Sequence, residues 1–148
     1  MSVGRRRGRI LAFQALTAWD MGGSVLDDLL TFPWQQTEKL ESELEADYLF
    51  PKMMVLGTIE NITEIDKVIQ ENLDNWIMDR LNSVDKAILR LSVYSLIYQK
   101  DTPPPIVIDE AINLAKDFGT DDSYKFVNAV LDSIKRECLD CSHAKDKN

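Results

Sequence analysis

Apolar residues recur every three or four positions along most of this chain, and they do not alternate with polar residues over any strand-length stretch. A spacing of three or four places apolar side chains on one face of an α-helix, whereas alternation would indicate a strand. The pattern predicts about seven helices, over residues 5–21, 25–30, 52–60, 64–73, 84–99, 107–118 and about 122–136. Helices joined by such short turns predict an all-α fold in which two small three-helix bundles pack together.

Glycine, proline and small polar residues mark the ends of these helices. Gly22 is expected to end the first helix, because glycine tolerates the left-handed conformation of a C-cap, and Gly119 is expected to cap a later one. The prolines at 103–105 stop the helix before them, since proline lacks the amide donor and clashes with the preceding turn. Thr63 and Ser83 are expected as N-caps of the helices that follow them.

The helix over 84–99 is apolar around most of its circumference, which predicts that it is the central, buried helix. The connector before it carries Trp76 and Ile77, which we expect to anchor it to the core. Further inward positions are expected at Leu56, Ile59, Ile62, Ile65, Val68, Ile69, Ile108, Ala111, Ile112, Ala115 and Phe118. The acidic stretch over 38–47 is either a solvated helix face or a loop.

Length and composition indicate one soluble domain. A chain of 148 residues with 45% hydrophobic and 28% charged residues is large enough to bury a core. No apolar run approaches the roughly 20 residues of a membrane span, and the start lacks the features of a secretory signal. We therefore expect a cytoplasmic protein without membrane contact, with a single domain over 1–148, a basic arm over about 1–9 and a mobile tail over about 139–148.

Charge is distributed unevenly along the chain. Four arginines, at positions 5, 6, 7 and 9, precede the first acidic residue, Asp20, and the remaining chain holds 13 basic against 25 acidic residues. A chain with surplus negative charge repels nucleic acid as a whole, so a concentrated cationic arm favours a local contact with phosphate. The alternative is a basic tag or solubilising N-terminus without further function.

Candidate catalytic and metal-binding groups are few. The one histidine, His143, lies in the expected tail, so a Ser–His or Cys–His nucleophile pair lacks a well-placed base. The acidic pairs at 109–110 and 121–122 are neighbours in sequence and point about 100° apart on a helix, which suits capping better than acid–base catalysis. Cys138 and Cys141 are either half of a zinc site or two incidental thiols. We predict no enzyme activity, no cofactor and no metal.

Two aromatic residues near the start of the last helix are candidates for contact with RNA. Tyr124 and Phe126 could stack on unpaired bases, the usual way in which single-stranded RNA is held. The alternative is that Phe126 belongs to the core.

Three passages of the chain stand out together: Arg5–Leu16, Val84–Tyr94, and Ile108–Gly119 with the following Ser123–Asp132. These passages resemble the NusB family of transcription antitermination factors. The resemblance implies two perpendicular three-helix bundles and binding to the boxA element of ribosomal RNA leader transcripts together with NusE, a small-subunit ribosomal protein. It also implies that this complex joins the elongating RNA polymerase and other Nus factors to suppress premature termination, without catalysis.

The resemblance also implies roles for particular residues. The RNA-binding positions that it implies are Arg5, Arg6, Arg7, Arg9 and Phe126, the last by stacking. Asp85 and Asp122 match acidic positions that face the RNA and NusE, although Asp122 could simply cap a helix. The chain departs from the family at Thr17, where many members carry an aromatic, and at Ala129, where a frequent glycine would allow close helix approach.

A second hypothesis uses the same fold without RNA. In that case the arginines would serve protein contacts or a homodimer interface. RNA affinity separates the two hypotheses.

Overall fold

The computed structural model describes residues 4–22, 25–33 and 48–140, with side chains as far as Glu137. Its α-helices are α1 (Arg5–Met21), α2 (Leu26–Leu29), α4 (Leu49–Glu60), α5 (Ile62–Glu71), α6 (Ser83–Tyr98), α7 (Pro104–Phe118) and α8 (Ser123–Ile134). A 3-10 helix, η1, covers Met78–Arg80, and a π-helix, η2, covers Lys135–Asp140. No strand occurs within these residues, so the predicted all-α fold is confirmed. The expectations for 38–47, Cys141 and His143 lie outside the described residues.

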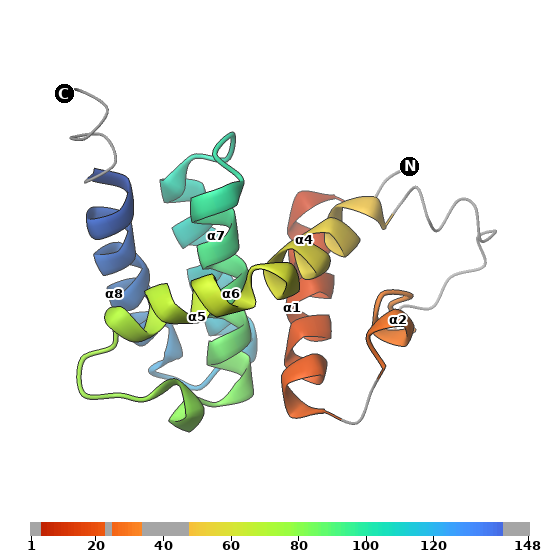
Figure 1. The fold of residues 1–148 in the computed structure, drawn as a ribbon, viewed down its shortest axis with the longest axis horizontal. Helices are drawn as coiled ribbons and strands as arrows, with labels where there is room; N and C mark the ends of the chain where they lie inside the picture. Colours follow the sequence, from red (N-terminus) through yellow and green to blue (C-terminus); the bar gives the residue numbers. More distant parts are fainter. Residues whose placement is uncertain (1–3, 23–24, 34–47, 141–148) are drawn as a thin grey trace.

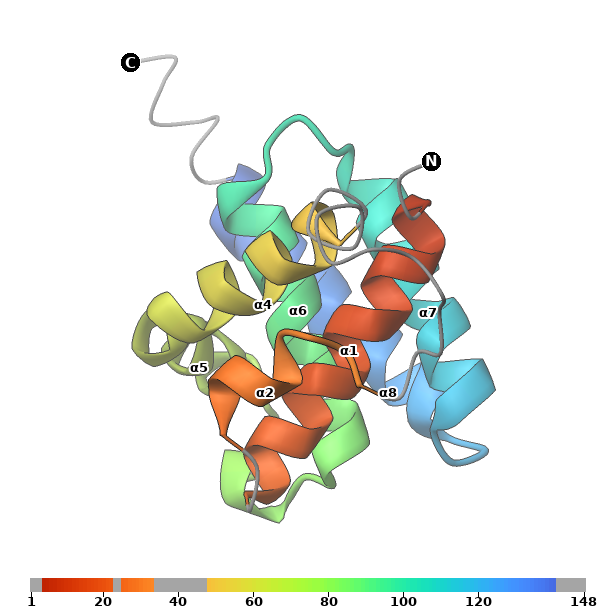
Figure 2. The ribbon, with the colours of Figure 1, turned by 90° about the vertical axis from the view of Figure 1, so that its right-hand side faces the viewer.

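The helices form two groups that pack side by side (Figure 1). Helices α1, α2 and α4 make one group, and α5 to α8 make the other. Helix α6 contacts α1 and α4 on one side and α5, α7 and α8 on the other, which confirms that it is the central helix. Viewed from the side of α2, α1 crosses in front of α6 and carries the N-terminal end of the described chain to the edge of the molecule (Figure 2).

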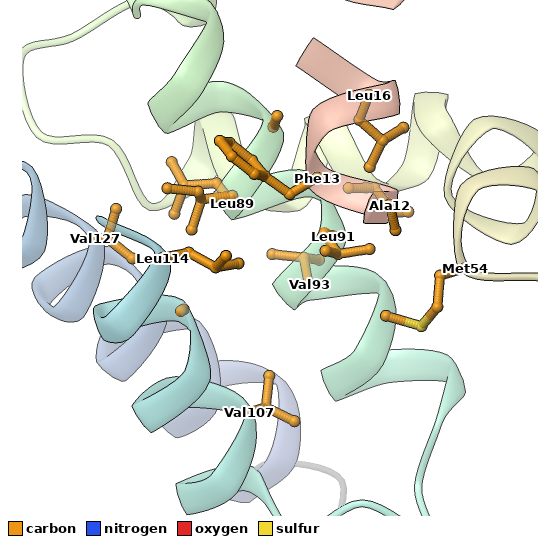
Figure 3. Close-up of a cluster of buried hydrophobic side chains, with 14 of the residues drawn as sticks. Ala12, Phe13, Leu16, Met54, Leu89, Leu91, Val93, Val107, Leu114 and Val127 are labelled. Atoms are coloured by element: carbon orange, nitrogen blue, oxygen red, sulfur yellow. The ribbon is translucent and has the colours of Figure 1, made fainter. Parts of the chain in front are cut away.

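The core lies between these groups (Figure 3). Phe13 of α1, Leu89 of α6 and Leu114 of α7 are buried there, with Met54 of α4 and Val127 of α8 completing it from the other helices. With Leu29 of α2 and Ile65 of α5, side chains from all seven described α-helices contribute to one hydrophobic cluster, which fixes the helices relative to one another.

The predicted bounds of α1 and the predicted last residues of α4 and α7 are confirmed, and the other helix ends are met only approximately. Helix α1 ends before Gly22, whose φ of 81° is the left-handed conformation that favours glycine. Helix α7 begins at Pro104, three residues before the predicted start, because proline in a first turn gives up no hydrogen bond. Gly119 follows it as the C-cap. None of the described helices is long and apolar enough to span a bilayer.

Two predicted N-caps are wrong. Helix α5 begins at Ile62, so Thr63 lies exposed within its first turn, and the capping position is Asn61. Helix α6 is capped by Asn82, whose side-chain oxygen accepts a hydrogen bond from the Asp85 amide at 2.8 Å. Ser83 is the first helical residue instead, and its hydroxyl donates to Asp20 at 2.9 Å.

The prediction that Trp76 and Ile77 anchor the connector to the core is also wrong. Their side chains are 53% and 55% exposed, and Met78 is the buried residue of this segment. The connector is held by Gln70, whose side chain accepts from the Met78 amide and donates to the Trp76 carbonyl. These two hydrogen bonds place Met78 inward and leave Trp76 on the surface.

Two of the predicted inward positions, Leu56 and Phe118, are exposed. Helix α4 packs on α1 and α6 through Met54, Val55 and Thr58, so Leu56 is turned outward and 37% exposed. Phe118 is 40% exposed, although its ring still packs on Phe13 with centroids 5.2 Å apart. The apolar face of each helix is set by its neighbours, and these two helices present slightly different faces from those that periodicity alone favours.

A cluster of ion pairs connects the two helix groups. Arg90 of α6 donates two hydrogen bonds of 2.9 Å to Asp66 of α5 and a third of 3.0 Å to Asp20 of α1. Asp20 also accepts from Ser83 and lies 3.4 Å from the Lys86 ammonium. Because Arg90 is only 9% exposed, its charge depends on both carboxylates for compensation.

Candidate functional site

The predicted basic arm is part of a helix. Arg5, Arg6, Arg7 and Arg9 occupy the first two turns of α1, where the first turn holds no acidic residue. The first three are exposed, and Arg9 is half-buried. A helix N-terminus already carries partial positive charge, so four guanidinium groups there create a strongly cationic end. We call these four residues the arginine face.

The side chains of the arginine face point to different sides of α1. The guanidinium carbon of Arg5 lies 4.2 Å from the centroid of the Phe50 ring of α4, and that of Arg9 lies 5.9 Å from it. Arg6 turns toward α7, where its guanidinium lies 3.4 Å from the Glu110 carboxylate. Partial burial lowers the pKa of Arg9, Glu110 opposes this shift, and neighbouring Arg5 adds to it.

Two hollows open beside the arginine face. Arg5 and Arg9 line one of about 350 Å³ against the turn between α6 and α7; its other lining residues are Gln99, Asp101, Thr102, Pro103 and Ile106. We call it the Arg5–Arg9 hollow. Arg6 lines another, of about 260 Å³, between α1 and α7. The Arg5–Arg9 hollow has one acidic residue in its lining, Asp101, whereas the hollow beside Arg6 is also lined by Glu110 and Asp117, so an anionic ligand is favoured in the Arg5–Arg9 hollow.

The other predicted site residues meet in a different hollow, of about 330 Å³. Its lining comes from η1, the starts of α6 and α8, and the turn before α8: Trp76, Arg80, Leu81, Asn82, Asp85, Thr120, Asp122, Ser123 and Phe126. We call it the Trp76 hollow. It brings Asp85 of α6 together with Asp122 and Phe126 at the start of α8, which are far from Asp85 in sequence.

The aromatic wall of the Trp76 hollow has two members. The rings of Trp76 and Phe126 lie edge to face, with centroids 6.3 Å apart. Phe126 is half-buried, so it packs against the core and lines the hollow at the same time. The core alternative for Phe126 is therefore met in part, and its contact with RNA stays a prediction. Sequence reasoning missed Trp76 as a site residue, although two large apolar residues in succession within a polar connector were a usable signal.

Asp85 is buried at the base of the hollow, with 7% of its surface exposed. One carboxylate oxygen, Oδ2, accepts from the Asn82 side chain at 3.2 Å. The other, Oδ1, is buried and has no hydrogen-bond partner among the described residues. A buried carboxylate oxygen left in this state favours a ligand that brings a hydrogen-bond donor. A partner would reach Asp85 through the hollow, not across an open surface.

The sequence predicted Asp121 or Asp122 as the cap of the last helix. Asp122 occupies the N-cap position of α8, but its side chain makes no capping hydrogen bond. The turn is instead closed by Ser123, whose hydroxyl accepts from the Thr120 amide at 2.9 Å. The Asp122 carboxylate is exposed and lines the hollow, where it is available to a partner.

The two parts of the candidate site lie at opposite ends of α1. The Trp76 hollow shares Asn82 and Thr120 with a neighbouring hollow that Thr17 and Met21 line at the C-terminal end of α1. The arginine face is at the N-terminal end of the same helix (Figures 1 and 2). The structure therefore does not gather all the predicted RNA-binding residues into one pocket.

The model of the NusB family matches residues 6–136. The chain belongs to the NusB family. A transcription antitermination protein NusB of Treponema denticola is 85% identical over 137 residues, which cover 93% of this chain and 99% of the relative. One from Treponema pallidum is 52% identical and covers 90% of this chain and 94% of the relative. Family membership places the chain among non-enzymatic transcription antitermination factors.

Solved structures of NusB proteins share the fold. A NusB structure of T. maritima superimposes with a TM-score of 0.78 at 36% identity and covers 93% of this chain and 94% of that one. A structure described as the antitermination factors NusB and NusE in complex with dsRNA gives a TM-score of 0.75 at 31% identity, covering 89% and 96%. The fold of two packed helix groups is thus that of the NusB family.

The two departures from the family pattern have different structural settings. The Thr17 hydroxyl donates to the Phe13 carbonyl of its own helix at 2.9 Å, and its side chain lines the hollow beside Met21. Ala129 is exposed on α8, so the expected effect of replacing a glycine on close helix packing is wrong for this chain.

Proposed function

We propose that this chain is an RNA-binding antitermination factor that recognises boxA-type single-stranded RNA together with NusE and supports processive transcription, chiefly of ribosomal RNA operons. The observation that carries the proposal is the arginine face: four arginines without an acidic residue among them, on a chain whose formal net charge is −8. Such a chain attracts RNA through this one region and repels it elsewhere. The complex of NusB and NusE with RNA among its structural neighbours supports the choice of partners.

The residues divide this task between the two ends of α1. Arg5, Arg6, Arg7 and Arg9 neutralise phosphates, and the ring of Phe126 in the Trp76 hollow takes a base by stacking. Asp85 and Asp122 line that hollow and face the partner, with the unpartnered Oδ1 of Asp85 accepting a donor from it. The negative charge of these two carboxylates disfavours phosphate, so they suit basic side chains of NusE.

The proposal extends to the assembly and its location. The whole chain acts as a single RNA-binding domain, and with NusE and RNA it joins the RNA polymerase elongation complex and other Nus factors. Its place of action is the cytoplasm, where bacterial transcripts are made.

The experiment that tests the proposal is fluorescence anisotropy of a labelled boxA-type RNA, of a scrambled RNA and of the boxA-type RNA in duplex form, each with and without NusE. Selective binding of the single strand, strengthened by NusE, is expected. The variant with Arg5, Arg6, Arg7 and Arg9 changed to alanine should lose this binding. For the wild type, log K should fall with log salt concentration with a slope of about −0.7 per phosphate contact, and so no steeper than about −3.

A matched control removes cations outside the arginine face and the named hollows, at Lys67, Lys135 and Arg136. Its RNA affinity should stay near that of the wild type. If the wild type binds no RNA in any combination, the proposal is wrong, and a helical adapter or homodimer that uses only protein contacts takes its place.

A further inference from the structure

Phe50 stands out because it is an aromatic residue of α4 in contact with two arginines of α1. It is half-buried and packs against the core, yet its ring face is covered by the guanidinium of Arg5, at 4.2 Å from the centroid. Arg9, one helical turn further along, approaches the same ring at 5.9 Å. Because Arg9 lies about one helical turn after Arg5, both side chains are on the same side of α1.

Gly8 allows this ring to lie against α1. A Cβ atom at position 8 would come within 2.6 Å of the Phe50 Cδ1 atom and 3.0 Å of Cε1. A glycine within a helix is unfavourable relative to alanine, so its presence in the second turn of α1 indicates that close approach of the ring is needed there. Gly8 is buried although arginines surround it in sequence.

A ring fixes a guanidinium group without neutralising it. The N–H donors of arginine lie in the plane of the group, so stacking of its face on an aromatic ring leaves the donors available to phosphate. Arg6 differs, because the Glu110 carboxylate that attracts it, at 3.4 Å, also competes with phosphate. Arg5 and Arg9 both approach the neutral Phe50 ring and also line the Arg5–Arg9 hollow, where a ligand can reach them beside one acidic residue, Asp101.

We propose that Phe50 is a positioning residue for RNA binding: its ring holds the guanidinium groups of Arg5 and Arg9 in place before RNA arrives, with their donors directed into the Arg5–Arg9 hollow. This inference rests on the proposed function. RNA phosphate then meets arginine side chains that have already lost part of their rotational freedom, which reduces the entropic cost of binding. The phosphate backbone is the part of the RNA that this arrangement recognises, so Phe50 contributes affinity and not sequence preference.

The test compares Phe50→Leu, which keeps an apolar side chain and removes the ring face, with Phe50→Tyr, which keeps the ring. Binding of boxA-type RNA is measured by anisotropy with NusE present, and thermal unfolding shows that each variant is folded. Phe50→Leu should weaken RNA binding about two- to fivefold, the range expected for one cation–π contact near the surface, and Phe50→Tyr should restore it. Phe50→Leu should weaken the binding of boxA-type RNA and of scrambled RNA by the same factor.

A double-mutant cycle separates positioning from general packing. In a background with Arg5 and Arg9 changed to alanine, Phe50→Leu should have no further effect on RNA affinity. An equal loss in both backgrounds would show that Phe50 acts only through packing and would overturn the inference. Unchanged affinity of Phe50→Leu in the wild-type background would overturn it as well.

A spectroscopic readout follows the same contact in the free protein. The side-chain resonances of Arg5 should show a ring-current shift that persists in Phe50→Tyr and disappears in Phe50→Leu and Gly8→Ala. A wild-type spectrum without this shift would contradict the inference. Absence of RNA binding by the wild type would overturn the proposed function and, with it, the role of Phe50. RNA binding by the wild type with an affinity that Phe50→Leu leaves unchanged would overturn only the role of Phe50.

Discussion

Asp20 is the residue whose charge depends most visibly on its neighbours. Burial of the carboxyl acts to raise its pKa, but the hydrogen bond from Ser83 and the charges of Lys86 and Arg90 outweigh this effect, and the pKa lies below its ordinary value. A carboxyl whose pKa is lower in the folded than in the unfolded chain stabilises the fold at pH values above its unfolded pKa of about 3.9. This contribution is lost as the pH falls through the folded pKa.

We therefore predict that Asp20→Asn lowers the free energy of unfolding by about 1–3 kcal/mol at neutral pH, because Arg90 keeps only one carboxylate. Between about pH 5 and pH 3 the variant should lose less stability than the wild type. Urea unfolding followed by circular dichroism across this pH range measures both effects.

The control for Asp20 is Asp132→Asn, which breaks the exposed pair of Asp132 on α8 with Arg136, four residues later in η2. An exposed pair of this kind contributes about 0.3–0.5 kcal/mol. Equal pH dependence of the wild type and Asp20→Asn would show that Asp20 does not contribute as described.

At this scale the sequence reveals a residue's chemistry but not its partner. Arg90 pairs with acids 24 and 70 positions away, and only the packing of α1, α5 and α6 brings them together. The four arginines, in contrast, could be identified directly, because their charge and their neighbours in sequence are enough to define a cationic end. Phe50 was not identified, since its importance comes from a contact between two helices.

The helices themselves followed from the spacing of apolar residues, because a helix needs only local periodicity and a suitable end. Their first residues were less certain, since Ser, Thr and Asn all cap helices and several often lie in succession. Asn82 and Ser83 are such neighbours, and the one that caps is decided by which side chain reaches the Asp85 amide. Trp76 was misplaced for a related reason: hydrogen bonds from Gln70 set the path of the connector.

The caps give a prediction for the helices as elements. Asn82→Ala should destabilise the protein by about 1 kcal/mol, because the Asp85 amide loses its acceptor. Thr63→Ala should be neutral or slightly stabilising, since Thr63 is exposed within α5 and alanine is the better helix former. Thermal unfolding of both variants checks this, and a larger loss for Thr63→Ala than for Asn82→Ala would reverse the assignment of the caps.

For the whole molecule, the decisive feature is the separation of the arginine face from the Trp76 hollow by the length of α1. That helix spans Arg5–Met21, and at about 1.5 Å per residue its ends are about 24 Å apart. One RNA strand that touches both ends must cover this distance, which takes about seven nucleotides at a rise of about 3.4 Å each. The separation was not accessible from the sequence, because it depends on the direction of α1 relative to α6 and α8.

The corresponding prediction concerns RNA length. Binding of an RNA of about 12 nucleotides should be weakened by the change of the four arginines to alanine and also by Phe126→Leu, which removes the ring. Phe126→Leu should not change the affinity for an RNA of about five nucleotides that binds at the arginine face, because this RNA is too short to reach the Trp76 hollow. Anisotropy with both lengths measures this.

Tyr98→Leu is the matched control for Phe126→Leu, since Tyr98 is an exposed aromatic of α6 that stacks on Tyr94. It should leave both RNA lengths unaffected. If Phe126→Leu also weakens binding of the short RNA, the strand binds at the Trp76 hollow and the arginines act at a distance.

The contacts of Arg90 have a consequence for how the protein can be divided. Asp20 belongs to one helix group and Asp66 to the other, while Arg90 lies between them on α6. Removal of α1, α2 and α4 would leave the buried Arg90 guanidinium without Asp20 and expose the apolar face that α6 presents to them, whereas removal of α5 to α8 would take away the helix on which α1 and α4 pack. We therefore expect that neither helix group folds on its own. The two groups form one folding unit, and a chain cut between them should unfold in both parts.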